Sequence, residues 1–161
     1  MVKIGIIGCG YWGPNLVRNF NSTKDSEVVC CADKDESRLS HIKSLYPMSV
    51  TNDYKELLTK KEIDAVIVAT PVETHYKIAK AALNAGKHVL IEKPITNSSD
   101  DAMELISIAE EKYKVLMVDH TFEYSAPVRK IKDIISNGEL GNIFTIDMIR
   151  VNLGLFQEKI N

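Results

Sequence analysis

The residues best suited to chemistry begin at position 8, where the segment GCGYWG directly follows an apolar run over residues 2–7. In a GxGxxG turn the first glycine permits a tight bend, the second lets the backbone approach a pyrophosphate, and the third lets helix and strand pack closely. The pyrophosphate lies at the helix N-terminus, where unpaired N–H groups and the helix dipole favour an anion. The residues of this turn that we expect to contact a dinucleotide are Gly8, Gly10, Tyr11, Trp12 and Gly13.

An acidic residue follows at the end of the next apolar run. Asp33 comes directly after residues 28–32 and lies twenty positions beyond Gly13. At the tip of a second strand, its carboxylate is placed to accept hydrogen bonds from the adenosine ribose. The alternative is a glycine-rich turn beside a solvated aspartate. Because strand, helix and Asp33 are in register, the pattern favours dinucleotide binding.

A second motif, Glu92-Lys93-Pro94, ends the apolar run over residues 88–92. In an open α/β sheet the carboxyl ends of the strands are the edge where ligands bind. Beside a nicotinamide cation, like-charge repulsion and partial burial would favour the uncharged amine of Lys93. The lysine could then act as a general acid or base toward a hydroxyl. Pro94 stiffens the turn, and an X-Pro bond at such a turn can be cis. The alternative for an isolated Glu-Lys-Pro is a surface ion pair at a strand end.

Two further groups of polar residues accompany the predicted strand ends. Thr70 and Pro71 follow the apolar strand at residues 64–70, and His75 comes four residues after Pro71. Thr70 can cap the next helix or meet the nicotinamide ribose, and His75 can touch the cofactor or serve a structural role. His120 and Tyr124 come after the last predicted parallel strand, as candidate substrate-side residues.

The elements that must position these residues alternate between strand and helix over residues 1–120. Apolar runs without polar alternation mark strands buried on both faces, which is typical of parallel sheets. Alternating β and α elements predict a doubly wound parallel sheet of the Rossmann type, with helices on both faces. The predicted strands cover residues 2–7, 28–32, 49–50, 64–70, 88–92 and 115–119.

The pattern changes over residues 121–161. Ser125 is a good N-cap and Pro127 suits a first helical turn, so a helix is expected up to residue 137. Residues 143–151 then alternate apolar and polar side chains, which predicts a half-exposed antiparallel strand. These elements are expected to begin a second α+β domain. A lone strand with an apolar face and unpaired edges would favour a homo-oligomer, a disordered tail or poor solubility.

Composition excludes several classes of protein. The chain has 161 residues, of which 45% are hydrophobic and 26% charged, and its net charge of −2 argues against nucleic acid or an anionic membrane surface as a partner. No apolar stretch approaches the ~20 residues needed to cross a bilayer. The N-terminus enters a strand without a signal sequence, so a cytoplasmic location is expected. Cys9, Cys30 and Cys31 lack metal-ligand spacing, and no metal site is predicted.

Taken together and in this order, the motifs resemble those of the Gfo/Idh/MocA oxidoreductases. The matching residues are GCGYWG, Asp33 with Arg38, Ala69-Thr70-Pro71 with His75, and Glu92-Lys93-Pro94. The resemblance implies NAD on the glycine turn and Asp33, Arg38 near the adenine, and Lys93 assisting removal of a hydroxyl proton. Hydride would pass from a sugar carbon to the nicotinamide. A carboxylate at Asp33 favours NAD because it repels a 2′-phosphate, while Lys34 beside it leaves NADP open.

Residues 10–20, GYWGPNLVRNF, and residues 120–124, HTFEY, resemble one branch of that family. The branch consists of UDP-N-acetylglucosamine and UDP-N-acetylglucosaminuronate 3-dehydrogenases, which serve the biosynthesis of surface polysaccharides. The resemblance therefore implies a sugar or UDP-sugar substrate.

Members of the family carry a second domain that completes the substrate pocket. We therefore expect this chain by itself to bind NAD without turning over a sugar. Two alternatives stay open: a stand-alone NAD-binding module with a regulatory or redox-sensing role, and a family member with another NAD-dependent reaction, such as glycoside cleavage.

Overall fold

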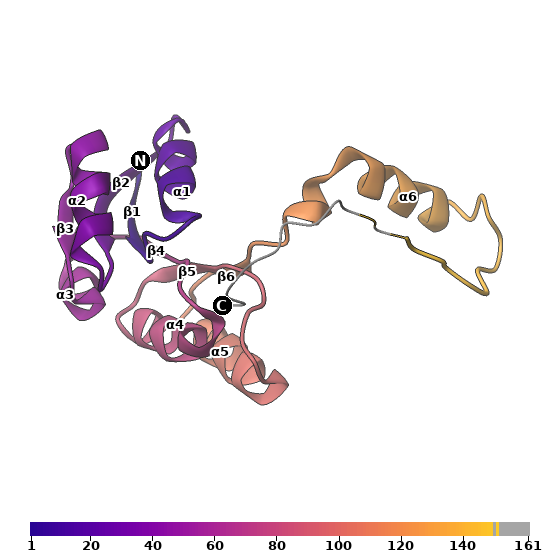
Figure 1. The fold of residues 1–161 in the computed structure, drawn as a ribbon. Helices are drawn as coiled ribbons and strands as arrows, with labels where there is room; N and C mark the ends of the chain where they lie inside the picture. The colour runs from indigo at the N-terminus through magenta and orange to yellow at the C-terminus, as the bar shows by residue number, and fades with distance from the viewer. Residues whose placement is uncertain (150, 152–161) are drawn as a thin grey trace. The chain divides into compact units, whose positions relative to one another are not determined.

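The computed structural model describes residues 1–149 and residue 151 of the chain. It divides into two compact units, Met1–Asp119 and His120–Asn161, and each is described by itself (Figure 1). The division lies one residue before the boundary expected at residue 120. That the second unit begins a substrate domain stays a prediction.

The first unit is built on a six-stranded sheet in the order β3-β2-β1-β4-β5-β6, and every neighbouring pair is parallel. The chain runs outward from β1 to β3 and then returns to the other side of β1, so the strand order reverses between β1 and β4. This is the Rossmann arrangement, and it confirms the predicted fold class. The strands are β1 (Val2–Ile7), β2 (Ser26–Ala32), β3 (Ser49–Thr51), β4 (Ala65–Val68), β5 (His88–Ile91) and β6 (Leu116–Val118).

Helices cover both faces of this sheet and create two separate cores. Strand β4 shows the division, because Ile67 joins the core with α1 and α2, whereas Val66 and Val68 join the core with α3, α4 and α5. Successive residues of a strand point to opposite faces, so a continuous apolar run supplies both cores. The helices are α1 (Gly13–Asn21), α2 (Glu36–Leu45), α3 (Tyr54–Thr59), α4 (His75–Asn84) and α5 (Ser99–Glu111), with a 3₁₀ turn at Val72–Thr74.

Local side chains determine where several helices begin. The Asp35 carboxylate accepts hydrogen bonds from the backbone N–H groups of Ser37 and Arg38 at the start of α2. The Ser98 hydroxyl accepts one from the Asp101 N–H at the start of α5. These caps satisfy N–H groups that have no partner inside the helix.

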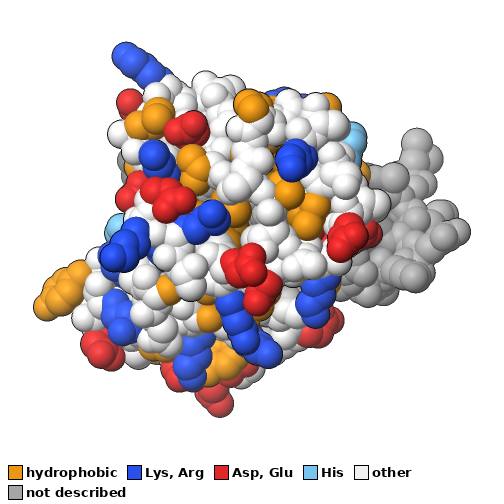
Figure 2. Space-filling model, turned by 90° about the vertical axis from the view of Figure 1, so that its left-hand side faces the viewer, with side chains coloured by type: hydrophobic (Ala, Val, Ile, Leu, Met, Phe, Trp, Pro, Cys, Tyr) orange, Lys and Arg blue, Asp and Glu red, His pale blue; other side chains and the backbone are white. Residues whose placement is uncertain are grey.

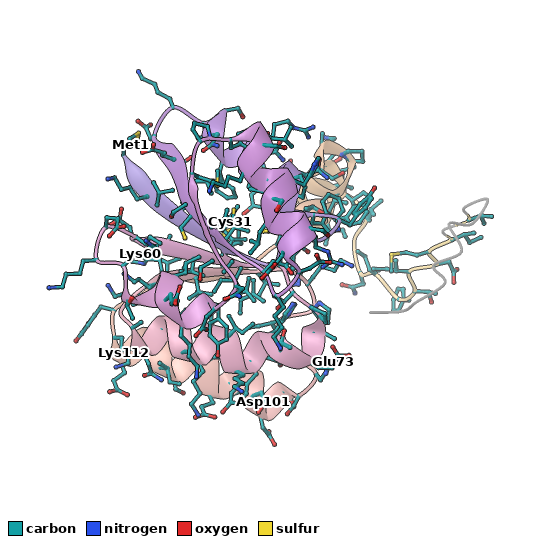
Figure 3. The ribbon with its side chains drawn as sticks, turned by 60° about the vertical axis from the view of Figure 1, so that its left-hand side comes forward. Met1, Cys31, Lys60, Glu73, Asp101 and Lys112 are labelled. Atoms are coloured by element: carbon teal, nitrogen blue, oxygen red, sulfur yellow. The ribbon has the colours of Figure 1, made fainter. Side chains whose placement is uncertain are left out.

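Figure 3 labels residues that lie at opposite ends of this unit. Glu73, just before α4, and Asp101, at the start of α5, lie toward one end of the unit, and Met1, Lys60 and Lys112 lie toward the other. The first end is the carboxyl edge, where the candidate site residues of this unit lie. On the face drawn in Figure 2, basic and acidic side chains are interspersed without a block of either sign.

The second unit contains a 3₁₀ turn at Thr121–Tyr124 and helix α6 (Ala126–Ser136). The predicted helix is confirmed, with Pro127 in its first turn, although the Ser125 side chain makes no capping hydrogen bond. The strand expected at residues 143–151 is wrong over its described part, because residues 143–149 and 151 have no regular structure; residue 150 lies outside the described residues. A strand needs a partner for its N–H and C=O groups, and the described residues of this unit contain none. Oligomerisation through this strand stays a prediction, but the described residues do not contain the strand on which it was based.

Among the described helices, none combines the length and apolar character that crossing a bilayer requires.

Candidate cofactor-binding site

The glycine turn after β1 has the shape that its sequence predicts. Gly8 has φ +102°, and a Cβ there would lie 2.3 Å from the carbonyl oxygen of Ala69 in the neighbouring strand-end loop. A Cβ on Gly13 would lie 2.9 Å from the carbonyl oxygen of Gly8. Both positions therefore require glycine, the first for the bend and the second for close packing of α1 against the end of β1.

Gly10 and the start of α1 leave room for an anion. The nearest atom to a Cβ on Gly10 is Nη1 of Arg38, at 3.6 Å, so the backbone here is open on its outer side. No side chain among the described residues caps α1, and its first turn carries no acidic residue. Free N–H groups at a helix N-terminus beside an open glycine backbone can bind a pyrophosphate. The turn therefore fits the pyrophosphate of a dinucleotide.

Asp33 is tied to this turn by hydrogen bonds. Its Oδ2 accepts the backbone N–H of Cys9 at 2.6 Å, and its Oδ1 accepts that of Asp35 at 2.9 Å. Nη1 of Arg38 lies 3.7 Å from Oδ2, and the Asp33 side chain is 9% exposed while that of Arg38 is 52% exposed. Asp33 therefore joins the end of β2 to the glycine turn and stands at its rim, with Lys34 exposed beside it.

An open pocket of about 320 Å³ lies beside Asp33, between the turn and α2. The rings of Tyr11 and Trp12 meet edge to face nearby, with centroids 5.4 Å apart. Sequence reasoning had included Arg38 and Tyr11 but had missed the other side chains of this pocket. The spacing of Ser37 and His41 one helical turn apart, just after Asp33, is the signal that could have revealed them. The pocket is lined by Cys9, Gly10, Tyr11, Pro14, Ser37, Arg38 and His41.

The ends of β4, β5 and β6 form the other half of the carboxyl edge. The N–H of Glu92 donates to the Val68 carbonyl at 2.9 Å, and the N–H of Asp119 donates to the Ile91 carbonyl at 2.8 Å. Lys93 follows with an exposed side chain, and its peptide bond to Pro94 is cis. Burial raises the pKa of the Glu92 carboxyl and the nearby Asp119 charge adds to this, whereas the Lys93 N–H and the charges of Lys93 and His75 lower it. The Lys93 side chain is thus exposed, whereas the acidic residues beside it, Glu92 and Asp119, are half-buried.

Thr70, Pro71 and His75 have structural contacts in this loop. The Thr70 hydroxyl accepts a hydrogen bond from the Thr74 hydroxyl at 2.7 Å, and neither side chain caps α4. Pro71 is exposed and precedes the 3₁₀ turn. His75 is 1% exposed, and both of its ring nitrogens meet backbone carbonyls, so its contacts fit the structural alternative.

His120 and Tyr124 belong to the second unit and are exposed there. The guanidinium of Arg129 lies 5.3 Å from the centre of the Tyr124 ring. Their substrate-side role stays a prediction. Within the described residues, no group of three or more His, Cys, Asp or Glu side chains is placed to hold a metal ion.

Comparison with known proteins places this geometry in a family. A family model described as "Oxidoreductase family, NAD-binding Rossmann fold" (GFO_IDH_MocA) matches residues 2–120. The chain is 34% identical over 145 residues to inositol 2-dehydrogenase of Salmonella paratyphi B, covering 87% of this chain and 43% of that protein. It is 29% identical over 143 residues to dTDP-3,4-didehydro-2,6-dideoxy-alpha-D-glucose 3-reductase of Saccharopolyspora spinosa, covering 88% and 43%.

Solved structures of oxidoreductases have the same fold as this chain. KijD10, a 3-ketoreductase from Actinomadura kijaniata in complex with NADP and TDP-benzene, matches with a TM-score of 0.79 at 28% identity over 85% of this chain and 42% of that one. Apo scyllo-inositol dehydrogenase from Lactobacillus casei shows the same fold, with a TM-score of 0.82 at 23% identity over 88% and 43%.

The chain spans half the length or less of the curated relatives that it matches, from 36% to 50%. A resemblance to UDP-N-acetylglucosamine 3-dehydrogenases in particular does not emerge from these relatives, among which are a dTDP-sugar 3-reductase and an inositol 2-dehydrogenase. The matched region coincides with the parallel sheet and its glycine turn. This chain belongs to the Gfo/Idh/MocA family of oxidoreductases, and residues 2–120 are its NAD-binding Rossmann domain.

Proposed function

We propose that this chain binds NAD along the carboxyl edge of its sheet and supplies the cofactor-binding part of an oxidoreductase for nucleotide-linked sugars. The observation that carries the proposal is the joint geometry of Gly8, Gly13 and Asp33. The glycines leave no room for a Cβ where helix and strand must close, and the aspartate is held at the rim of the same turn.

Each part of the edge has a separate task in this proposal. The N–H groups of residues 10–13 and the start of α1 hold the pyrophosphate. Asp33 accepts the ribose hydroxyls, and Arg38 lies beside the adenine in the 320 Å³ pocket. Thr70 and Pro71 lie on the nicotinamide side, after β4, and Lys93 lies after β5.

The chemistry is the oxidation of a CH–OH carbon, or its reverse. Bound NAD supplies the hydride acceptor for such a reaction. The proton of the reacting hydroxyl goes to the uncharged amine of Lys93 at Nζ, and in the reverse direction the Lys93 ammonium returns it to the carbonyl oxygen. General acid or base assistance of this kind contributes about 10²- to 10⁴-fold in rate. The partial burial expected for Lys93 from the sequence is not found, because its side chain is exposed; this exposure leaves Nζ accessible to a bound substrate, and the charge of the bound nicotinamide is the proposed influence on its proton affinity.

The substrate class rests on the relatives and on two segments of the sequence. One relative is a dTDP-sugar 3-reductase, and one solved structure is a 3-ketoreductase with a TDP compound bound. Residues 10–20 and 120–124 resemble the UDP-N-acetylglucosamine 3-dehydrogenase branch, so a UDP-linked amino sugar of polysaccharide biosynthesis in the cytoplasm is the specific form of the proposal. Substrate positioning requires groups outside residues 1–120, and the chain alone is therefore proposed to be inactive.

Cofactor preference follows from the charge of Asp33. Its carboxylate disfavours a 2′-phosphate, which supports NAD over NADP, whereas Lys34 and Arg38 lie close enough to reduce that preference. Because the similar structure of KijD10 contains NADP, the binding of both NADH and NADPH should be measured.

The experiment is a titration of the protein with NADH and NADPH, followed by the fluorescence of Trp12, which is the single tryptophan and lies in the turn. We expect saturable binding that favours NADH, and Asp33→Ser should remove the preference. Asp53→Ser is the matched control, because the Asp53 carboxylate, like that of Asp33, accepts the backbone N–H two residues further on, but it lies at the start of α3 and not at the glycine turn. Absence of saturable binding by the folded protein contradicts the proposal.

Activity is tested in the same preparation. UDP-N-acetylglucosamine and its uronic acid, with NAD, should give no turnover above background, whereas a fusion of this chain to the C-terminal part of a full-length relative should reduce NAD. Turnover by this chain alone would contradict the proposed inactivity but not the cofactor site.

A further inference from the structure

His75 connects two loops of the carboxyl edge. It is the first residue of α4 and is 1% exposed. Its Nε2 lies 2.7 Å from the Thr70 carbonyl oxygen, in the loop after β4. Its Nδ1 lies 2.9 Å from the Pro94 carbonyl oxygen, in the loop after β5. One buried ring therefore bridges the ends of the two strands that flank the nicotinamide side of the proposed site.

Both partners of the ring are acceptors. A backbone carbonyl can accept a hydrogen bond but not donate one, and a neutral imidazole carries a single N–H. Both short contacts are hydrogen bonds only when both ring nitrogens carry hydrogen, because otherwise one nitrogen lone pair faces a carbonyl lone pair. The distances of 2.7 and 2.9 Å lie within the range of N–H···O hydrogen bonds.

The surroundings supply the compensating charge. The acidic residues at this edge of the sheet are Glu92, which follows β5, and Asp119, which follows β6. A buried imidazolium whose two N–H groups both meet carbonyl oxygens has hydrogen-bond partners for its charged form.

We propose that His75 is a positioning residue, an imidazolium that ties the loop after β4 to the Lys93–Pro94 turn and so places Lys93 for proton transfer. The inference rests on the proposed function, because it assigns the loops to the nicotinamide end of the cofactor. The Pro94 carbonyl that His75 holds belongs to the residue directly after Lys93. A change of about 1 Å in such a position can cost 10²-fold in rate, so a rigid tie at this point matters for the reaction.

The first test concerns the ring itself. Nitrogen-15 NMR of the histidine-labelled chain at neutral pH should show both His75 ring nitrogens bonded to slowly exchanging hydrogens. The assignment comes from the signals lost in His75→Gln. A His75 ring with one nitrogen free of hydrogen would overturn the proposal. This measurement needs no cofactor, so its result is independent of whether the chain binds NAD.

The second test separates the two ends of the cofactor. NADH and ADP-ribose share the adenosine and pyrophosphate groups, but ADP-ribose lacks the nicotinamide. We expect His75→Gln to weaken NADH binding about tenfold, the size of one lost hydrogen bond, and to leave ADP-ribose binding unchanged. The matched control is His88→Gln, since His88 lies at the opposite end of β5 and its Nδ1 accepts one backbone N–H, from Val115. It should leave both affinities unchanged.

The outcomes are distinguishable. If the folded wild type binds neither ligand, the proposed function fails, whatever the state of the ring. If the wild type binds both and His75→Gln weakens both equally, or neither, His75 has a merely structural role and the inference is overturned. If His75→Gln does not fold, the His75 signals are assigned by elimination from His41→Gln, His88→Gln and His120→Gln, and the NMR result on the wild type decides.

Discussion

Replacing Asp33 with alanine should destabilise the fold, quite apart from any cofactor. The substitution removes the acceptor of the Cys9 N–H at 2.6 Å and of the Asp35 N–H at 2.9 Å. Cys9 is 4% exposed, so water cannot readily replace the lost acceptor, whereas Asp35 is exposed and its N–H is rehydrated. The Arg38 guanidinium, 3.7 Å away and half exposed, adds little.

The magnitude follows from the buried bond. A hydrogen bond to a charged group contributes about 1.5–3 kcal/mol, and a buried donor left unpaired loses it in full, so Asp33→Ala should lower the free energy of unfolding by about 2–3 kcal/mol. Asp33→Asn keeps one acceptor oxygen and should lose less. Asp35→Ala removes the cap of α2 together with an exposed ion pair to Arg38, and it should cost less than Asp33→Ala because water replaces these contacts.

The assay is urea unfolding at neutral pH followed by far-UV circular dichroism, with the slopes compared to verify that the unfolded states are alike. Asp33→Ala should lower the free energy of unfolding most, and Asp33→Asn and Asp35→Ala should each lower it less. If Asp33→Ala costs no more than Asp35→Ala, the carboxylate is not the essential acceptor of the Cys9 N–H and the reasoning is refuted.

Two further predictions follow from the same edge of the sheet. Gly8→Ala places a Cβ 2.3 Å from the Ala69 carbonyl at φ +102° and should cost more than about 4 kcal/mol, whereas Gly86→Ala, at φ +76° with no described atom within 4 Å, should cost about 1–2 kcal/mol by thermal or urea unfolding; equal costs would contradict the packing argument. Because burial raises the pKa of Glu92, the folded protein holds a proton that the unfolded chain releases. The free energy of unfolding of the wild type, relative to Glu92→Gln, should therefore fall as pH rises through the interval between the usual and the raised pKa; a relative stability that rises there contradicts the burial of this carboxyl.

Much of the fold was predictable because its signals are local. The uninterrupted apolar run at β4 supplies Ile67 to one core and Val66 and Val68 to the other, and a sequence shows that pattern directly. The glycine turn was also predictable, since the bend at Gly8 and the close approach at Gly13 each need a residue without a side chain. Reasoning from periodicity failed at residues 143–149, where alternation is present but the described residues offer no neighbouring strand.

The functions of several polar residues depended on contacts between distant positions. Lys87 reads as an ordinary surface lysine, yet it is 7% exposed and its Nζ donates to the carbonyls of Lys60 and Ile63, each at 2.7 Å. The pocket residues Ser37 and His41 became recognisable only when α2 was seen beside the turn.

The sequence by itself determined the strand and helix order, the glycine turn and the position of Lys93 at a strand end, because each depends on neighbouring residues. Only the tertiary structure decided what Asp33 and His75 contact. Asp33 holds the N–H of a residue 24 positions away, and His75 holds a carbonyl 19 positions away. Which backbone group lies next to such a side chain depends on which strands are neighbours in the sheet. The residue type alone does not specify that partner.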